Sequence, residues 1–396
     1  MSIKKFGWIL LVLLACAGIS FGSYSIGRDR AQKDAAAELE KAESLNREKL
    51  EEAEALNLAE RELNIALNRA ELETLKLVDG PIYVFGHKNP DSDTVCSSIV
   101  YAGILQQLGY DARPAVQGKI NHETAYILKM AGVEVPEMIP DAAGKNVVLI
   151  DHGEEIQSAD GIKDANIISI IDHHNDGSIN TAGQLIYDAR PIGSTATIAW
   201  IRARNYGVEV DASMATLIFG AMMSDTSNLK SLNTTSADRA AYEELPKIAG
   251  IEDPEAFYRE MFKASLSYEG MPDTEILNSD IRDYEAGGKT YSIGCMNTYD
   301  EPTAMDLANR MKVLLPELCA ERGVEMSFAQ ISIFHDDISI CYIVPSDETA
   351  AEVLEAAFPD GGYVFDGVSY VFDPGFSRRQ VLVPAINDVL AAHPGE

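Results

Sequence analysis

The chain has 396 residues, which is enough for two ordinary domains and additional segments. It carries 62 acidic and 32 basic residues, a formal net charge of −30, and so lacks the basic footprint that nucleic acids need in a partner. An anionic substrate would therefore have to be attracted by metal ions and a few placed cations. The five cysteines form no CxxC pair, which leaves a zinc ribbon or a thioredoxin-like motif without support.

Residues 1–27 contain an apolar stretch that begins after Lys4 and Lys5 and approaches the length of a membrane span. Three interpretations stay open for it. It could be a retained transmembrane anchor, a cleaved signal peptide, or a lipoprotein signal, because the residues up to Cys16 resemble a lipobox. We expect this segment to place the protein at a membrane. Basic residues on both flanks leave the side of the membrane undetermined.

Residues 28–78 predict one long helix, because they contain no Pro or Gly and are rich in Ala, Glu, Leu, Lys and Arg. Leu56, Leu63, Ala70 and Leu77 recur every seven residues, a spacing typical of a coiled coil. We expect a helical stalk, with a homodimer as one possible consequence.

Short apolar runs alternate with helical segments after Gly80. The runs 82–85, 147–150 and 167–171 are typical of strands buried on both faces, which favours a parallel sheet of βαβ units. Segment 192–265 has a mainly helical pattern, and a break falls near 267–272. The prediction is an α/β fold, with a parallel-sheet domain over 79–266 and a smaller α+β domain over 273–396, preceded by the long helix.

Asp and His side chains follow each of the three predicted strands. His87, Asp91 and Asp93 follow the first, Asp151 the second, and Asp172, His173 and His174 the third. Ligands in open α/β sheets gather beyond the carboxyl ends of the strands, so we expect one cleft. Carboxylates and imidazoles without a thiolate favour Mn²⁺, Co²⁺, Mg²⁺ or Fe²⁺. This many carboxylates predicts two metals that share one Asp. We also expect Asp93 to cap the helix that follows.

Several segments, in this order, resemble the DHH phosphoesterase superfamily and, more narrowly, the family II manganese-dependent inorganic pyrophosphatases: GHKNPDSDTVCSSIVYA (86–102), VVLIDHGE, IIDHH and RPIGSTATI (190–198). MFKAS (261–265) and SRRQVLVP (377–384) resemble two further segments of that family. The resemblance covers residues 81–390 and implies a DHH catalytic domain followed by a substrate-binding domain of the DHHA2 type. It also implies hydrolysis of inorganic pyrophosphate to two orthophosphates by a metal-bridging hydroxide.

The resemblance implies a role for each matching residue. One metal would be bound by His87 and Asp91, the other by Asp93, His173 and Asp225, and Asp151 would bridge them. His174 would lie beside the phosphate and share the catalytic role with Asp151. Lys263, Arg378 and Arg379 would neutralise the remaining charge of a small phosphate substrate. The implied cofactors are two Mn²⁺ or Co²⁺ ions, with Mg²⁺ accompanying the substrate. The second domain would close over the first.

The sequence departs from the family pattern at Gly153, where the family has Asn, and at 377–380, where one cation is replaced or missing. Two alternatives therefore stay open. One is another phosphoanhydride or phosphodiester hydrolase of the superfamily, acting on short polyphosphate or a small nucleotide. The other is a weakly active, membrane-tethered scaffold, against which the complete set of six predicted metal ligands argues.

Overall fold

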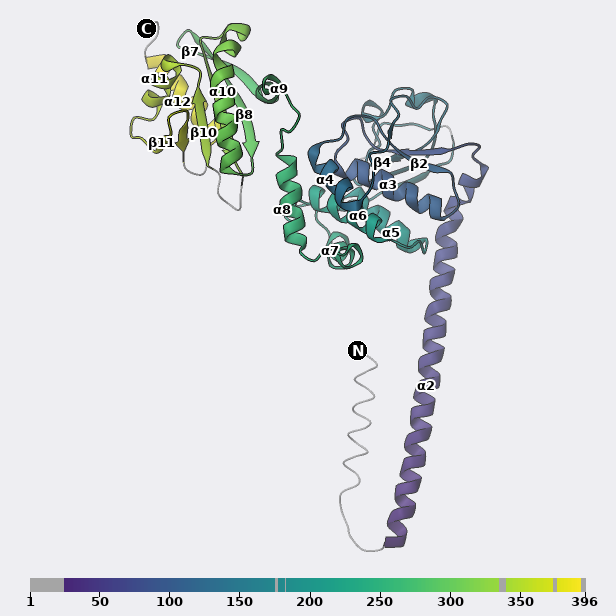
Figure 1. The fold of residues 1–396 in the computed structure, drawn as a ribbon. Helices are drawn as coiled ribbons and strands as arrows, with labels where there is room; N and C mark the ends of the chain where they lie inside the picture. The colour runs from purple at the N-terminus through teal and green to yellow at the C-terminus, as the bar shows by residue number, and fades with distance from the viewer. Residues whose placement is uncertain (1–24, 175–176, 182, 335–339, 373–375, 393–396) are drawn as a thin grey trace. The chain divides into compact units, whose positions relative to one another are not determined.

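The computed structural model describes residues 25–174, 177–181, 183–334, 340–372 and 376–392 (Figure 1). The chain divides after Ala70 into two compact units. The first contains one long helix, and the second contains two six-stranded sheets with their helices.

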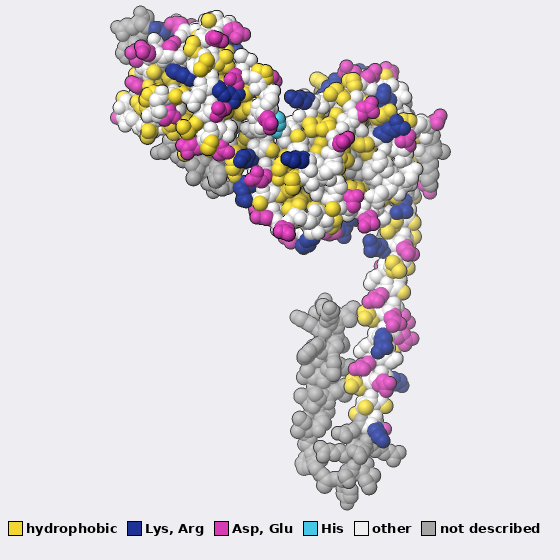
Figure 2. Space-filling model, viewed as in Figure 1, with side chains coloured by type: hydrophobic (Ala, Val, Ile, Leu, Met, Phe, Trp, Pro, Cys, Tyr) yellow, Lys and Arg dark blue, Asp and Glu magenta, His cyan; other side chains and the backbone are white. Residues whose placement is uncertain are grey.

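The long helix α2 spans Ser25–Ala70 and confirms the helix predicted from the sequence. Its leucines, including Leu56 and Leu63, are exposed, and Figure 2 shows hydrophobic side chains interspersed with acidic and basic ones along it. The α-helix is shorter than predicted, because residues 71–77 form the 3₁₀ helix η1 (Glu71–Leu77). Leu72 and Leu75 of η1 are buried in the core of the first sheet domain, so this segment packs as part of that domain.

The prediction of a membrane-anchored protein needs correction. Most of the predicted anchor, residues 1–24, lies outside the described residues. Its last residues, 25–27, begin the charged helix α2, which continues with Arg28, Asp29 and Arg30. Among the described residues, no helix combines the length and the apolar character that a membrane crossing requires.

The first sheet has the strand order β3-β2-β1-β4-β5-β6, and all its strand pairs are parallel. The strands are β1 (Ile82–Phe85), β2 (Ala112–Val116), β3 (Glu137–Met138), β4 (Asn146–Ile150), β5 (Asn166–Asp172) and β6 (Ile186–Ala189). Alternate residues face opposite sides. On β4, Val148 and Ile150 enter the large core, whereas Val147 and Leu149 enter a smaller core on the other face. The three predicted strands and the parallel sheet are confirmed.

Helices cover this sheet on the side of the large core (Figure 1). They are α3 (Ser92–Gln107), α4 (His122–Ala131), α5 (Thr195–Asn205), α6 (Ala212–Asp225), α7 (Ser236–Ala249) and α8 (Pro254–Ser265). The last four confirm the helical pattern predicted for 192–265. Short 3₁₀ helices, η2 (Glu155–Gln157) and η3 (Ile162–Asp164), lie between β4 and β5.

The second sheet follows a break between α8 and α9 (Asp273–Asn278), as the sequence predicts. Its strand order is β11-β12-β10-β9-β8-β7, with β8 and β9 parallel and the other pairs antiparallel. Its elements are β7 (Ile281–Ala286), β8 (Lys289–Thr298), α10 (Glu301–Arg322), β9 (Met326–Ile333), β10 (Cys341–Pro345), α11 (Glu348–Ala357), β11 (Tyr363–Phe365), β12 (Tyr370–Phe372), the π-helix η4 (Arg378–Leu382) and α12 (Val383–Ala392). This is the smaller α+β domain that the sequence predicts.

Candidate metal centre

The first predicted site loop leaves β1 at Phe85 and enters α3 at Ser92. A Cβ at Gly86 would lie 2.3 Å from Cγ2 of Thr94 and 3.0 Å from the carbonyl oxygen of Ile150, so only glycine fits this close approach to α3 and the end of β4. Asp91 caps α3, because its carboxylate accepts a hydrogen bond from the Thr94 amide at 2.9 Å. The predicted cap, Asp93, is therefore wrong: Asp93 lies inside the first turn.

Asp93 is fully buried and receives three hydrogen bonds. The amides of Thr195 and Ala196, at the start of α5, donate at 2.6 and 2.9 Å, and the Ser97 hydroxyl donates at 2.9 Å. A helix N-terminus favours a negative charge at this place. Burial and the neighbouring charge of Asp151 nevertheless raise the pKa of Asp93 to about 7.

Asp151 follows β4 and lies at the centre of the cluster. Its backbone has φ = 63°, a left-handed conformation that is uncommon for a residue other than glycine and is found at functional sites. Its two carboxylate oxygens accept hydrogen bonds from the hydroxyls of Thr94 (2.8 Å) and Thr195 (2.9 Å). They also lie 3.6 Å from Nε2 of His87 and 3.4 Å from Nε2 of His173.

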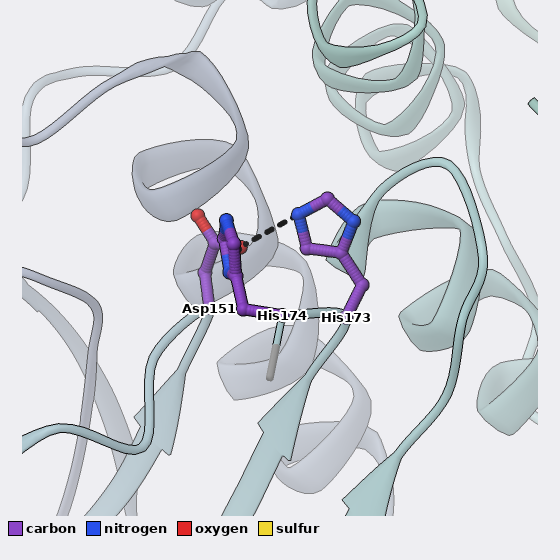
Figure 3. A group of neighbouring side chains, drawn as sticks. All are labelled: Asp151, His173 and His174. Carbon is purple, nitrogen blue, oxygen red and sulfur yellow. Dashed lines mark ion pairs between the residues drawn. The ribbon is translucent and has the colours of Figure 1, made fainter. Parts of the chain in front are cut away.

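His173 and His174 follow β5, and Figure 3 shows the ring of His173 facing the carboxylate of Asp151. Nδ1 of His173 donates to the carbonyl oxygen of Ile192 at 3.0 Å, which places the lone pair on Nε2. That Nε2 is buried and has no hydrogen-bond partner among the described residues. A ring fixed through one nitrogen, with the other free, is the usual state of a metal-binding histidine.

His174 is held by the carboxylate of Asp172. The same oxygen of Asp172 accepts hydrogen bonds from the amides of His173 and His174 and, at 2.9 Å, from Nδ1 of His174. This hydrogen bond is the main reason why the pKa of His174 rises to about 9. The side chain of His174 is 56% exposed, so a ligand outside the cluster can contact it.

The ring of His87 lies between two carboxylates. Its Nε2 is 3.3 Å from Asp91 and 3.6 Å from Asp151. Burial by itself would lower the pKa of His87, but the hydrogen bonds and charges of these two carboxylates outweigh it and raise the pKa to about 10.

Asp225 is the last residue of α6, and its carboxylate lies 3.3 Å from Nε2 of His173. Burial, together with the charges of Asp93 and Asp151, raises the pKa of Asp225 well above its usual value. Such crowding of like charges is unfavourable unless cations neutralise it.

Three triplets of possible ligands emerge, each with its ligand atoms within 4.8 Å of one another: His87–Asp91–Asp151, Asp93–His173–Asp225 and Asp151–His173–His174. The structure thus brings together all six residues predicted as metal ligands, and His174 with them. The free buried nitrogen of His173 and the excess of carboxylates fit divalent cations with mixed nitrogen and oxygen ligands.

A cavity of about 240 Å³ opens beside this cluster. It is lined by His87, Asp151, His152, Gly153, Glu154, Gln157, Asp172 and His174. His152 is buried with both ring nitrogens occupied, by the Ile150 carbonyl and the Ser158 hydroxyl, so it supports the loop and does not reach a ligand.

The three basic residues predicted to bind the substrate belong neither to these triplets nor to the lining of this cavity. Lys263, near the end of α8, lies 3.7 Å from the carboxylate of Asp300. Arg378 donates to the carboxylate of Asp280 at 2.8 and 3.1 Å, and Arg379 follows it in η4.

Three supporting residues are not among the candidates that the sequence offers: Thr94, Thr195 and Glu123. Glu123, in the first turn of α4, accepts hydrogen bonds from the hydroxyls of Ser92 (2.7 Å) and Ser224 (2.5 Å). Each serine directly precedes a predicted ligand, so Glu123 joins the two segments that carry Asp93 and Asp225. A signal exists only for Thr195, because Ser194 and Thr195 stand at a helix start.

Two family models match most of the sheet-containing part of the chain. The family model described as "DHH family, N-terminal domain" matches residues 81–222, and that of the "DHHA2 domain" matches residues 259–389. The chain is 39% identical over 308 residues to a protein of Methanothrix thermoacetophila named manganese-dependent inorganic pyrophosphatase, which covers 77% of this chain and 97% of the relative. It is 31% identical over 312 residues to a protein of the same name from Bacillus subtilis, which covers 78% of this chain and 99% of that relative.

Proposed function

The chain belongs to the family of the manganese-dependent inorganic pyrophosphatases and hydrolyses inorganic pyrophosphate, and we propose that the reaction takes place at the cluster around Asp151. The observation that carries this proposal is the shared position of Asp151. Its carboxylate belongs to the triplet of His87 and Asp91 and also faces His173, which belongs to the triplet of Asp93 and Asp225.

We propose the following ligand assignment. His87 and Asp91 would hold one divalent cation, Asp93, His173 and Asp225 the other, and Asp151 both. When bound, the two cations supply neutralising charge and acidify a water, which makes attack on phosphorus possible near neutral pH. Mn²⁺ is the expected metal, with Co²⁺ as a substitute and Mg²⁺ accompanying the substrate.

The side chains of the chain itself have three tasks in this proposal. The Thr94 and Thr195 hydroxyls orient the Asp151 carboxylate, and the Ile192 carbonyl orients His173. His174, kept protonated by Asp172, would donate a hydrogen bond to a phosphoryl or leaving oxygen. Lys263, Arg378 and Arg379 would bind the remaining phosphate charge once the second domain closes.

We also propose bounds for the two domains and a pairing of the long helix α2. The catalytic domain would span 79–266, and the substrate-binding domain 273–396. The exposed leucines of α2, such as Leu56 (61% exposed) and Leu63 (59% exposed), would pair with the same helix of a second copy as a coiled coil. Sedimentation of the full chain tests this pairing, and a monomer at micromolar concentration would contradict it.

The experiment that tests the function is a metal add-back assay. The full chain is stripped of metal and supplied with Mn²⁺, Co²⁺, Mg²⁺ or Zn²⁺, and phosphate release is measured from pyrophosphate, tripolyphosphate, ATP and a dinucleotide. We expect release from pyrophosphate with Mn²⁺ or Co²⁺. A preference for tripolyphosphate or a nucleotide would assign the site to another substrate of the superfamily. Metal binding without release from any of them would contradict the proposal.

A further inference from the structure

The 3₁₀ helix η1 lies before residue 81, where the family match begins, and yet it packs as part of the first sheet domain. Leu72 and Leu75 are 1% and 3% exposed within the large core. The Tyr110 hydroxyl donates to the carbonyl oxygen of Leu72 at 2.9 Å. Glu71, the first residue of η1, is thereby held at a fixed place on this domain.

Glu71 pairs with a buried arginine of α5. The guanidinium of Arg202 is almost fully buried and donates to Glu71 at 2.8 Å and to Asp188 of β6 at 2.5 Å. It also lies over the rings of Tyr101 and Tyr206, and the Tyr206 hydroxyl hydrogen-bonds to both Arg202 and Glu71. A buried guanidinium is stable only when carboxylates balance its charge, so Arg202 depends on both partners.

Asp188 connects this ion cluster to the loop that supports the metal centre. Its carboxylate also accepts two hydrogen bonds from Arg190, at 2.6 and 2.8 Å, and Arg190 begins the loop 190–195. Within that loop the Ile192 carbonyl accepts from His173, and Thr195 donates to Asp93 and Asp151. Three predicted ligands are therefore oriented by one loop, and Asp188 and Arg190 fix the start of that loop.

We infer that Glu71 is a positioning residue for the metal centre: with Asp188 it holds Arg202, and through Asp188 and Arg190 it fixes the loop 190–195 that orients Asp93, Asp151 and His173. The inference rests on the proposed function of that cluster. It assigns to the segment that precedes the family match a part in metal binding, in addition to its part in packing.

The physical reason is the sharing of Asp188. Without Glu71, Asp188 is the remaining carboxylate partner of the Arg202 guanidinium among the described residues, and Asp188 also accepts hydrogen bonds from Arg190. A rotation of the Asp188 carboxylate that gave both of its oxygens to Arg202 would break its hydrogen bonds with Arg190, and the loop would lose one of the contacts that hold its start. Because the Glu71 side chain is 40% exposed, water can replace part of the lost interaction.

The test uses the full chain with Glu71→Ala and Glu71→Gln, and Glu73→Ala as the matched control. Glu73 is an exposed carboxylate of the same 3₁₀ helix. Mn²⁺ affinity of the metal-free protein is measured by competition with a chelator, and the midpoint of unfolding in urea is measured on the same samples. Direct partners of metal ligands contribute about 10- to 100-fold in affinity, and Glu71 acts through intermediates. We therefore expect about three- to tenfold weaker Mn²⁺ binding for Glu71→Ala.

Glu71→Gln keeps a hydrogen-bond acceptor without the charge, so we expect intermediate binding, and it serves as the test if Glu71→Ala fails to fold. The control should bind Mn²⁺ like the wild type. If both Glu71 variants bind Mn²⁺ within twofold of the wild-type affinity, the inference is wrong, even if their unfolding midpoints in urea are lower. Because binding is measured without turnover, a wild type that binds Mn²⁺ but leaves pyrophosphate intact would contradict the proposed function alone.

Discussion

Both sheet domains bury neutral polar side chains, but among the described residues only the first domain also buries Asp, His and Arg side chains. In the first domain, charged or titratable side chains are buried: Asp93, Asp151, His152, Asp172, Arg202 and Asp238. Among the described residues of the second domain, the buried polar side chains are neutral: Ser292, Thr298, Ser327, Gln330, Ser332, Ser346 and Ser369. Both sheets have six strands and apolar cores, but the first sheet is all parallel, whereas in the second all strand pairs except β8–β9 are antiparallel.

The difference shows where the fold supports chemistry. A buried charge costs several kcal/mol unless it is paired or hydrogen-bonded, so it is kept where it has a task. Asp238 has a structural role. It accepts hydrogen bonds from Gly193, Thr197 and Thr235 and so holds the loop 190–195 from the side of α7. Asp93 and Asp225 are different, since their pKa values stay raised and the protein alone does not balance their charge. This imbalance is what divalent cations would correct.

The largest effect is expected from removing the charge of Asp151, at the centre of the buried charged cluster. Asp151→Asn keeps a residue that tolerates the left-handed backbone but removes the carboxylate that faces both halves of the cluster. We expect pyrophosphate hydrolysis to fall about a thousandfold. The metal-free variant should be no less stable than the wild type, because Asp151 raises the pKa of Asp93 and Asp225. Steady-state kinetics and urea unfolding measure both, and activity close to that of the wild type would refute the ligand assignment.

Asp188 tests whether the buried ion cluster stabilises the first domain. Burial alone would raise its pKa, but hydrogen bonds from Arg190 and Arg202 outweigh this and hold the pKa below its usual value. Asp188→Asn leaves two arginines underpaired, so we expect a loss of roughly 2–3 kcal/mol at neutral pH.

The pH dependence of this loss follows from the depressed pKa. The stabilisation by Asp188 is present above the unfolded-state pKa, about 4, and is lost as the pH falls through the lower pKa of the folded state. Urea unfolding of wild type and variant from pH 7 to pH 3 should therefore converge at the acid end. A constant difference over this range would show that the loss comes from packing and not from charge.

The same contrast explains what could be predicted from the sequence. The strands β1, β4 and β5 are continuous apolar runs, and the Asp and His residues directly after them could be placed at one sheet edge from parallel topology alone. The sequence does not predict strands β2, β3 and β6. Strand β2 contains Arg and Pro, strand β3 has only two residues, and in strand β6 every second side chain is exposed. Their place in the sheet is decided by tertiary pairing.

The supporting residues of the site were harder to predict than its candidate ligands. The ligand types are visible in the sequence, but the hydroxyl of Thr94 reaches Asp151 across 57 positions, and Glu123 reaches Ser224 across 101. Asp225 was found only through family resemblance, since a carboxylate at a helix end is common. The end of α2 was also misplaced, because the heptad pattern continues to Leu77, whereas burial of Leu72 and Leu75 in the core favours a 3₁₀ turn.

A smaller effect is expected for Glu123, because it contacts the segments of the site through the hydroxyls of Ser92 and Ser224 and not through the candidate ligands themselves. Glu123→Ala removes the acceptor that joins Ser92 to Ser224, so we expect about tenfold weaker Mn²⁺ binding. Glu134→Ala changes an exposed carboxylate just after the same helix and should leave the affinity unchanged. Isothermal titration of the metal-free proteins measures both affinities. Equal affinities for the two variants would remove Glu123 from the support of the metal centre.

The smallest effect is expected in the second domain, where the hydroxyls of Ser292 on β8 and Ser327 on β9 hydrogen-bond at 2.6 Å in the buried sheet. Ser292→Ala leaves the Ser327 hydroxyl without this partner, which should cost about 1 kcal/mol of unfolding free energy. Replacing both serines by alanine removes the unsatisfied group as well, so the double variant should recover part of that loss. Neither change alters charge, so Mn²⁺ affinity should stay at the wild-type value. Urea unfolding and Mn²⁺ titration of the two variants and the wild type test this. A change in metal affinity would mean that the neutral core of the second domain also supports the metal centre.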